Sequence, residues 1–226
     1  TQTVQIPDAR VLPLFTLLAQ PNTICDASLT NPSIQYNGAV DATVTNLIGL
    51  IADYTFTWTD EETSAVIAGV TGPNLANRDT SYYTAVVEHV PTGCVSNPVT
   101  AQVTPSFSLP VITATANAST NCDPLLANGQ ALVSDVDGAG TGAPYTFQWH
   151  DGNNTAVMLA TETNPLLDNR QGGVGEFYTV LVTNLSDGCR NTQTVQIPDA
   201  RVLPLFTLLT QPNSICDTPL TNPAIQ

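Results

Sequence analysis

The pentapeptide Tyr54–Trp58 reads YTFTW, and it returns later in the chain as Tyr145–Trp149, which reads YTFQW. In both, aromatic residues alternate with smaller polar ones, which is the period-2 pattern of a β-strand with one buried face. We interpret the two pentapeptides as central strands of related domains, with Trp58 and Trp149 packed in hydrophobic cores. A platform for stacking sugars is the alternative role for the two tryptophans.

A long repeat surrounds these strands. Residues 1–35 recur as residues 192–226, an offset of 191, and five positions differ. Each difference exchanges one small residue for another: Ala19/Thr210, Thr23/Ser214, Ala27/Thr218, Ser28/Pro219 and Ser33/Ala224. We therefore expect the chain to be one full period of a tandem array plus a fragment of the next, a window whose ends are not natural domain ends.

A shorter period divides the long one into two related domains of ordinary sandwich size. Cys-Asp pairs begin at Cys25, Cys122 and Cys216, and Leu-Pro pairs begin at Leu12, Leu109 and Leu203. No Gly/Ser linker separates the domains, and proline stiffens each joint, so the pattern predicts an extended rod. The predicted boundaries are 1–12 (last strand of a preceding immunoglobulin-like domain), 13–109 (domain 1), 110–203 (domain 2) and 204–226 (first strand of a following domain).

The predicted fold class is all-β: tandem immunoglobulin-like β-sandwich domains stapled by disulfides. Alternation in domain 1 predicts strands over residues 15–18, 38–46, 54–59, 65–68, 81–90 and 99–104, and in domain 2 the strand that matches 81–90 covers residues 176–184. In the 81–90 strand one face carries Tyr83, Ala85, Val87 and His89, and polarity does not settle which face points inward. No window has a helical apolar period, so almost no helix is expected.

Composition excludes several partners. The chain has no lysine, five arginines and 19 acidic residues, for a net charge of −14. This balance argues against binding to nucleic acid or to an anionic membrane, and the lack of lysine excludes Lys–Asn isopeptide crosslinks. No stretch reaches the 18 to 20 or so apolar residues of a membrane span, so no membrane insertion is expected in this segment.

The cysteines are predicted to form structural disulfides. Cys25 and Cys94 bracket domain 1, and Cys122 and Cys189 bracket domain 2, so we predict the pairs Cys25–Cys94 and Cys122–Cys189. Cys216 would be left unpaired by truncation. Zinc is disfavoured because no C-x₂-C spacing exists and the two histidines are scattered. Disulfides of this kind require an oxidising compartment, which places the protein outside the cell.

Residues 142–149, 175–183 and Gly188–Cys189 together resemble the repeat of giant adhesins in gliding Bacteroidota, which reads G-x-P-Y-x-Y/F-x-W, then G-x-Y-x-V-x-V-T, then G-C. Domain 1 has the same frame without the G-x-P. The resemblance implies bacterial cell-surface display, export by the type IX route, and a role in adhesion, gliding or filament formation. The second cysteine lies too far beyond the tyrosine for an antibody-type tyrosine corner, so none is expected.

No catalytic, cofactor-binding or metal site is predicted. Asp135 and Asp137 precede a Gly-rich turn that could hold calcium, but the acidic residue that completes an EF-hand loop is missing, so an ordinary turn is favoured. Interdomain calcium at Asp8, Asp123 and Asp199 is a weaker alternative. No catalytic motif recurs between the domains, so we predict a protein that is not an enzyme.

The predicted function is the structural shaft of an extracellular repeat adhesin or surface filament, built from a two-domain repeat of 191 residues. Its partners would be adjacent copies of the same repeat, in one chain or in a filament. Two alternatives stay open. The domains could bind a glycan or another cell-surface ligand, or the chain could be a separately secreted subunit that polymerises by strand exchange.

Overall fold

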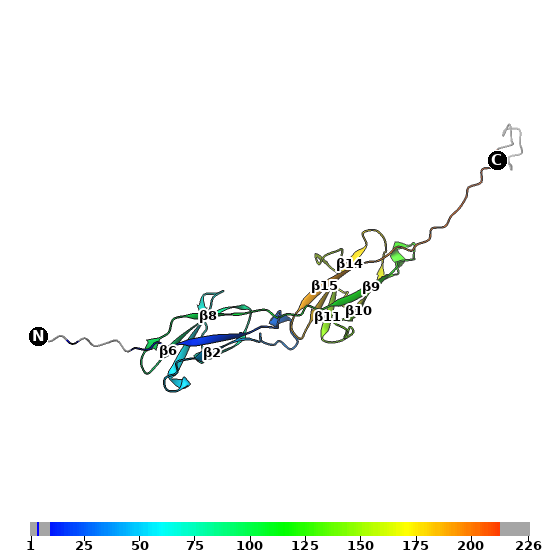
Figure 1. Ribbon diagram of the computed structural model, residues 1–226. Coiled ribbons are helices and arrows are strands. Elements are labelled where there is room, and N and C mark those ends of the chain that lie inside the picture. The colour runs from blue at the N-terminus through cyan, green and yellow to red at the C-terminus, as the bar shows by residue number, and fades with distance from the viewer. Residues whose placement is uncertain (1–3, 5–9, 213–226) are drawn as a thin grey trace, which may run out of the picture.

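The computed structural model describes Val4 and residues 10–212, which form two β-sandwiches joined end to end (Figure 1). Each sandwich consists of two facing antiparallel sheets. In the first sandwich, one sheet has the order β1-β2-β5, and in the other β3 lies between β4 and β6 while β6 also pairs with β7 and β8. The strand bounds are β1 (Phe15–Gln20), β2 (Gly38–Val44), β3 (Tyr54–Asp60), β4 (Ala65–Val66), β5 (Asn74–Arg78), β6 (Ser81–His89), β7 (Cys94–Val95) and β8 (Val99–Val103).

The second sandwich repeats this plan, with sheets of order β9-β10-β13 and β12-β11-β14-β15. Its strands are β9 (Ile112–Asn117), β10 (Gly129–Val136), β11 (Tyr145–Asp151), β12 (Val157–Met158), β13 (Leu166–Arg170), β14 (Phe177–Asn184) and β15 (Arg190–Gln196). Helix is confined to three short 3₁₀ turns in the described residues: η1 (Ala27–Leu29), η2 (Ile51–Asp53) and η3 (Pro124–Leu126). The predicted all-β fold class is confirmed.

The strands predicted in domain 1 are present to within a few residues at each end, but two strands were missed: β5 and the two-residue β7. β5 carries one buried side chain, Leu75, while its other residues are exposed or partly exposed, and Asn77 has a φ of 59°. It therefore lacks the alternation that identified its neighbours. β13 in the second sandwich has the same character, with Leu167 buried and Asn169 at a φ of 55°.

Each sandwich has its own core. Trp58 and Trp149 are fully buried, as predicted, and each indole Nε1 donates to a backbone carbonyl oxygen, of Gly72 (3.0 Å) and of Asn164 (2.9 Å). In β6 the inward face is the one that carries Tyr83, and the buried aromatic residues of the neighbouring strand β3 belong to the same core. The alternation in the sequence thus identified the strand, whereas the face that is buried is the one covered by the opposite sheet, β1-β2-β5.

A tyrosine-corner contact is present, so the prediction that none exists was wrong. The Tyr83 hydroxyl donates to the carbonyl oxygen of Asp79, four residues upstream, at 3.0 Å. This contact depends on the turn between β5 and β6, which the cysteine spacing does not report. Burial of the Tyr83 phenol raises its pKa to about 12.

The Tyr83 contact is expected to stabilise the first sandwich. Tyr83→Phe removes the hydroxyl and leaves the Asp79 carbonyl without its partner, which should lower the free energy of unfolding by about 1 kcal/mol. Urea unfolding followed by Trp58 fluorescence, in a Trp149→Phe background, measures the change. Tyr82→Phe in the same background is the control, because Tyr82 is half exposed on the opposite face of β6. Equal effects of the two substitutions would contradict this role.

Candidate functional site at the joint between the sandwiches

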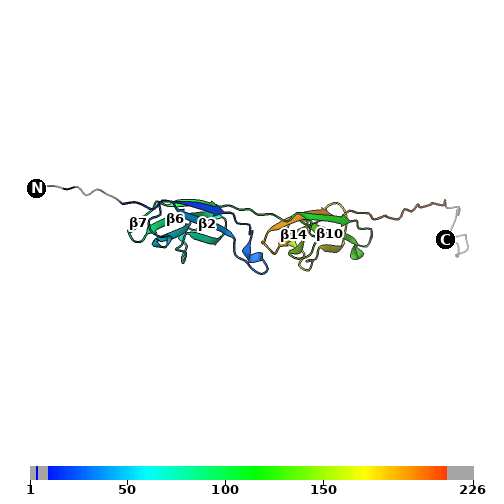
Figure 2. The same cartoon turned by 60° about the horizontal axis from the view of Figure 1, so that its bottom comes forward.

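A disulfide joins the two sandwiches. Cys25, in the loop that follows β1, is bonded to Cys189, which immediately precedes β15, with their Cα atoms 4.9 Å apart. The loop of residues 21–37 extends from the first sandwich toward the second, so that the bond crosses the joint (Figure 2). The two cysteines are 164 residues apart in sequence, and almost all of both sandwiches lies between them.

The predicted pairs Cys25–Cys94 and Cys122–Cys189 were therefore wrong. Cys25 lies near the Ser81 end of β6, because Asn22 is bridged to Pro105 just after the strand that pairs with Ser81. Cys94 pairs with His89, at the other end of the same strand. A nine-residue strand spans about 27 Å, whereas the Cα atoms of a disulfide lie within about 7 Å. In the structure Cys94 is a buried free thiol and Cys122 an exposed one, and Cys216 lies outside the described residues.

Backbone hydrogen bonds accompany the disulfide across the joint. The amides of Cys25 and Asp26 both donate to the carbonyl oxygen of Asp187, at 2.8 and 3.3 Å, and the amide of Asn31 donates to that of Leu185 at 2.8 Å. Asp187 also organises its own turn, since its carboxylate accepts the Cys189 amide at 2.8 Å. The loop of the first sandwich thus docks on a turn that is already shaped by its own hydrogen bonds.

Gly188 allows this close approach. It has a φ of +70°, and a Cβ built on it would collide with the carbonyl oxygen of Asp26. The counterpart turn of the first sandwich contains Gly93, with a φ of +66°, where a Cβ would meet nothing within 4 Å. The two glycines therefore have similar backbones, and they differ in whether a Cys-Asp loop is docked on them.

Charge contributes little to the joint. Asp26 caps η1, and hydrogen bonds from the Ser28 hydroxyl and amide, with a smaller contribution from Arg190, hold the pKa of its carboxyl below the usual value. The Arg190 guanidinium lies 4.0 Å from the Asp26 carboxylate, and both side chains are partly exposed. Because exposed pairs of this kind contribute about 0–1 kcal/mol, the disulfide and the backbone bonds hold the joint.

A second strap consists of the chain itself as it leaves the first sandwich. Asn22 is fully buried. Its backbone amide donates to the carbonyl oxygen of Thr104 at 3.0 Å, and its backbone carbonyl oxygen accepts from the amide of Ser106 at 2.8 Å. These bonds hold the exit segment alongside the docking loop. The same parallel bridge recurs at the far end of the second sandwich, between Ser119 and Asp199.

The acidic residues considered as calcium ligands are engaged in turns and caps. Asp135 accepts the amides of Gly138 and Gly140, and Asp137 accepts the Val111 amide and the Tyr145 hydroxyl, as in an ordinary turn. Asp123 caps η3, Asp199 pairs with Arg201, and Asp8 lies outside the described residues. Hydrogen bonds from Arg201 lower the pKa of the Asp199 carboxyl to about 2.

The two histidines do not form a shared site. His89 and His150 are both buried, each in a different sandwich, so the structure does not bring them together. Among the described residues, no group of three or more His, Cys, Asp or Glu side chains is arranged to hold a metal ion. In the same part of the chain, no helix has the length and apolarity needed to cross a membrane.

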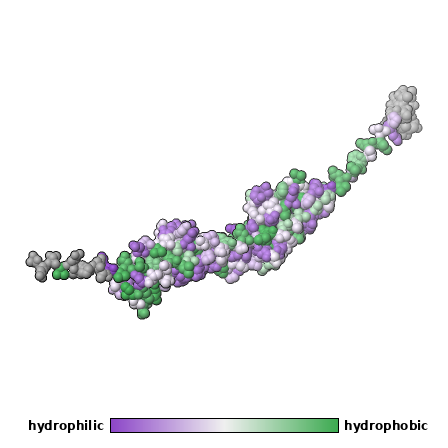
Figure 3. All heavy atoms as spheres, viewed as in Figure 1, coloured by the Kyte–Doolittle hydropathy of each residue, from purple (hydrophilic) through white to green (hydrophobic). Residues whose placement is uncertain are grey.

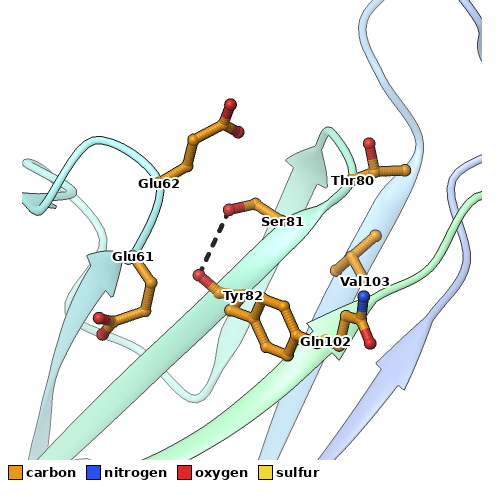
Figure 4. Close-up of a pocket in the computed structure, with 7 residues that line it drawn as sticks. All are labelled: Glu61, Glu62, Thr80, Ser81, Tyr82, Gln102 and Val103. Carbon is orange, nitrogen blue, oxygen red and sulfur yellow. Dashed lines mark hydrogen bonds between the residues drawn. The ribbon is translucent and has the colours of Figure 1, made fainter.

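An open hollow lies on the first sandwich, where the turn after β3 approaches β6 and β8 (Figure 4). The half-exposed Tyr82 ring lies beside Gln102, the Glu61 and Glu62 side chains also line the hollow, and the Ser81 hydroxyl bonds to Asp60 at 2.8 Å. A hollow lined by an exposed aromatic ring and by carboxylates can bind a sugar or a cation. This hollow could not be identified from the sequence, because its residues come from the turn after β3 and from the regions of β6 and β8, which are far apart in sequence.

No family model matches the sequence, and no curated protein matches it. Similar solved structures include three N-terminal domains of the outer capsid protein Hoc of bacteriophage RB49 (TM-score 0.34, 14% identity, 83% of this chain and 58% of that chain). Others are the amphioxus IgVJ-C2 molecule (0.25, 14%, 68% and 92%) and domains 7 to 9 of the S-layer protein SbsC (0.27, 13%, 72% and 56%). Because these TM-scores are low, the class of protein is assigned from the order of the strands in the sheets and not from these structures.

The sheet orders define that class. In immunoglobulin nomenclature β1, β2 and β5 correspond to strands A, B and E, and β4, β3, β6 and β8 to strands C′, C, F and G. The second sandwich has the same order. The chain is therefore a tandem immunoglobulin-like β-sandwich protein stapled by a disulfide.

The contrast between the two glycines leads to a test of the joint. Gly188→Ala should lower the equilibrium constant for forming the Cys25–Cys189 disulfide by about tenfold or more, because the new methyl group meets the Asp26 carbonyl and the docking loop must move. Mass spectrometry of alkylated protein, equilibrated in glutathione buffers, measures this constant. Gly93→Ala carries a similar backbone strain without the collision, so it should leave the constant unchanged. A loss of equal size in both variants would show that the contact is not needed.

Proposed function

We propose that this chain is part of the structural shaft of an extracellular surface protein, in which a disulfide across the domain joint carries tension. The observation that carries the proposal is the Cys25–Cys189 bond between the two sandwiches. A bond of this kind requires an oxidising compartment, which supports a location outside the cell. The acidic surface supports solubility and repulsion between neighbouring molecules.

The position of the disulfide determines which part of the chain would bear a pulling force applied at the two ends. Tension entering through β1 reaches Cys25, crosses to Cys189 and leaves through β15, so the chain between the two cysteines is bypassed. That segment includes β2 to β14, and therefore most of both cores. Unfolding of either core would not lengthen the shaft while the bond remains.

The same bond stabilises the folded state. In the chain-entropy model a closed loop of 164 residues is worth about 5 kcal/mol, because the unfolded chain loses more freedom the longer the loop is. The pairing across the joint therefore stabilises both sandwiches and fixes one against the other. A single bond thus serves stability and stiffness together.

The particular type of shaft is proposed from the sequence. The G-A-P-Y-T-F-Q-W stretch of residues 142–149 and the closing Gly188–Cys189 resemble the repeats of gliding-type Bacteroidota adhesins. The recurrence of residues 1–35 as 192–226 supports an array of such units in one long chain. A bacterial adhesin or filament built in this way would hold a binding tip away from the cell.

Single-molecule pulling on the full 226-residue chain tests the proposal. Opening the Cys25–Cys189 bond should release about 560 Å of contour length, since 164 residues extend by about 3.4 Å each. We expect this extra length in the Cys25→Ser/Cys189→Ser variant and in the reduced chain, and not in the oxidised chain. Cys94→Ser/Cys122→Ser is the matched control and should extend like the oxidised parent. Full extension of the oxidised parent would refute the bypass.

A binding module is the second candidate, and the hollow beside Tyr82 is the observation that favours it (Figure 4). Under the shaft proposal, the chain should bind no glycan on an array, with or without calcium. Specific binding at micromolar concentration that is lost in Tyr82→Ala, and kept in the Val95→Ala control on β7, would assign the chain to the binding module instead.

A further inference from the structure

At the far end of the second sandwich, a segment that matches β1 in sequence pairs with no sheet. Residues 203–212 match residues 12–21 at every position except Thr210, where Ala19 stands in the first copy. In the first copy this sequence forms β1, and Phe15 is 8% exposed. In the second copy Phe206 is 82% exposed and no strand pairing occurs within residues 203–212, which extend away as an apolar segment (Figure 3).

The same end carries a docking loop without a partner. Cys122 and Asp123 correspond to Cys25 and Asp26, and in both loops the aspartate caps a 3₁₀ turn by accepting the amide two residues on. Both loops are also bridged to the exit segment of their own sandwich. Cys122 is exposed as a free thiol, whereas Cys25 is bonded.

The opposite end of the molecule carries the complementary turn. Gly93 and Cys94 correspond to Gly188 and Cys189, and in both turns the glycine amide donates to a carbonyl four residues upstream, of His89 at 2.9 Å and of Asn184 at 2.8 Å. The space above Gly93 is open, whereas the Asp26 carbonyl fills the space above Gly188. Cys94 is thus a free thiol on a turn shaped to receive a Cys-Asp loop.

The two ends of the molecule thus carry the two halves of a joint like the one between the sandwiches: the Cys122 loop at one end and the Gly93–Cys94 turn at the other. We propose that the far end of the second sandwich docks a second copy of the first sandwich, of which residues 204–212 are the first strand, and that Cys122 forms a disulfide with Cys94 of the second copy. The inference rests on the proposed shaft function and extends it. Every opening cysteine then bonds to the closing cysteine of the next domain and never to that of its own.

The second joint would differ from the first in its supporting contacts. The loop between Cys122 and β10 is shorter than the loop between Cys25 and β2, so it contains no counterpart of Asn31, whose amide bonds to Leu185. Arg190, which faces Asp26, is replaced by Val95 on the receiving turn. The Cys122 bond should therefore be reduced more readily than the Cys25 bond, and firm and weaker joints would alternate along the shaft.

The oxidation balances as thiol–disulfide exchange with a small disulfide oxidant. The Cys122 thiolate attacks the oxidant, forms a mixed disulfide and releases one thiolate of the oxidant. The Cys94 thiolate of the second copy then attacks the Cys122 sulfur and releases the other. Two protein thiols and one disulfide become one protein disulfide and two small thiols.

The test uses the full chain with one more repeat unit. Because Gln226 aligns with Gln35, residues 1–226 are followed directly by residues 36–226, and the protein is oxidised with glutathione disulfide. Mass spectrometry of non-reduced peptides should show Cys122 joined to Cys94 of the second copy, together with the Cys25–Cys189 pair. In a redox titration, the Cys122 bond should be reduced at a lower glutathione concentration.

Two variants separate docking from folding. Gly93→Ala in the second copy should lower the yield of the new disulfide about tenfold, whereas the same change in the first copy should have no effect on it. Cys122→Ser should leave Cys94 of the second copy as a free thiol, detected by alkylation of the denatured protein, while Cys25–Cys189 stays formed. A free Cys122, or a Cys122–Cys189 bond, overturns the inference. If the Cys25–Cys189 pair forms while Cys122 stays free, the inference alone fails; if the Cys25–Cys189 pair is absent as well, the proposed function fails too.

Discussion

The disulfide between Cys25 and Cys189 is the constraint on which the arrangement of the two sandwiches depends. It brings the loop after β1 onto the turn before β15, so that three backbone hydrogen bonds can form across the joint. These bonds are short-range and would contribute little between two freely moving domains, because each must offset the loss of orientational freedom. Once the disulfide holds the loop in place that entropy is already lost, and the same contacts can define a single orientation.

The direction of the strands explains why the bond crosses the joint. In an antiparallel sandwich successive strands reverse direction, so from β1 to β7 the odd-numbered strands end at one end of the domain and the even-numbered strands at the other. Cys25 follows the first strand and Cys94 follows the sixth, which places them at opposite ends. The wrong pairing was predicted because each pair of cysteines brackets one domain, and bracketing in sequence does not report the end of the sandwich at which a cysteine lies. With β5 counted, the strand before Cys94 is the sixth and ends away from Cys25. The recurrence of Leu-x-Asn-Arg at residues 75–78 and 167–170 was the signal that could have identified β5.

Most of the fold could be predicted because it rests on local alternation, whereas the joint rests on contacts between residues far apart in sequence. The aromatic strands and both tryptophan cores follow from the period-2 pattern and the repeat. Periodicity did not find β5, whose place in the sheet depends on Leu75 and on pairing with β2. The approach of the Asp26 carbonyl to Gly188 depends on how two folded domains meet, and no spacing in the sequence reports it. A glycine before a cysteine was visible in both domains, but its use as a docking surface became visible only with the partner in place.

Pairing across a joint has a mechanical consequence that pairing within each domain would lack. Two bonds inside the domains would each shorten the extension of one domain and leave the joint free to bend. A bond from the forward end of one domain to the near end of the next spans only 4.9 Å between Cα atoms, yet it closes 164 residues of chain. The distance bridged is small, while the length removed from the force path is large. A short cross-domain bond is therefore an efficient way to make a shaft of small sandwiches both stiff and inextensible.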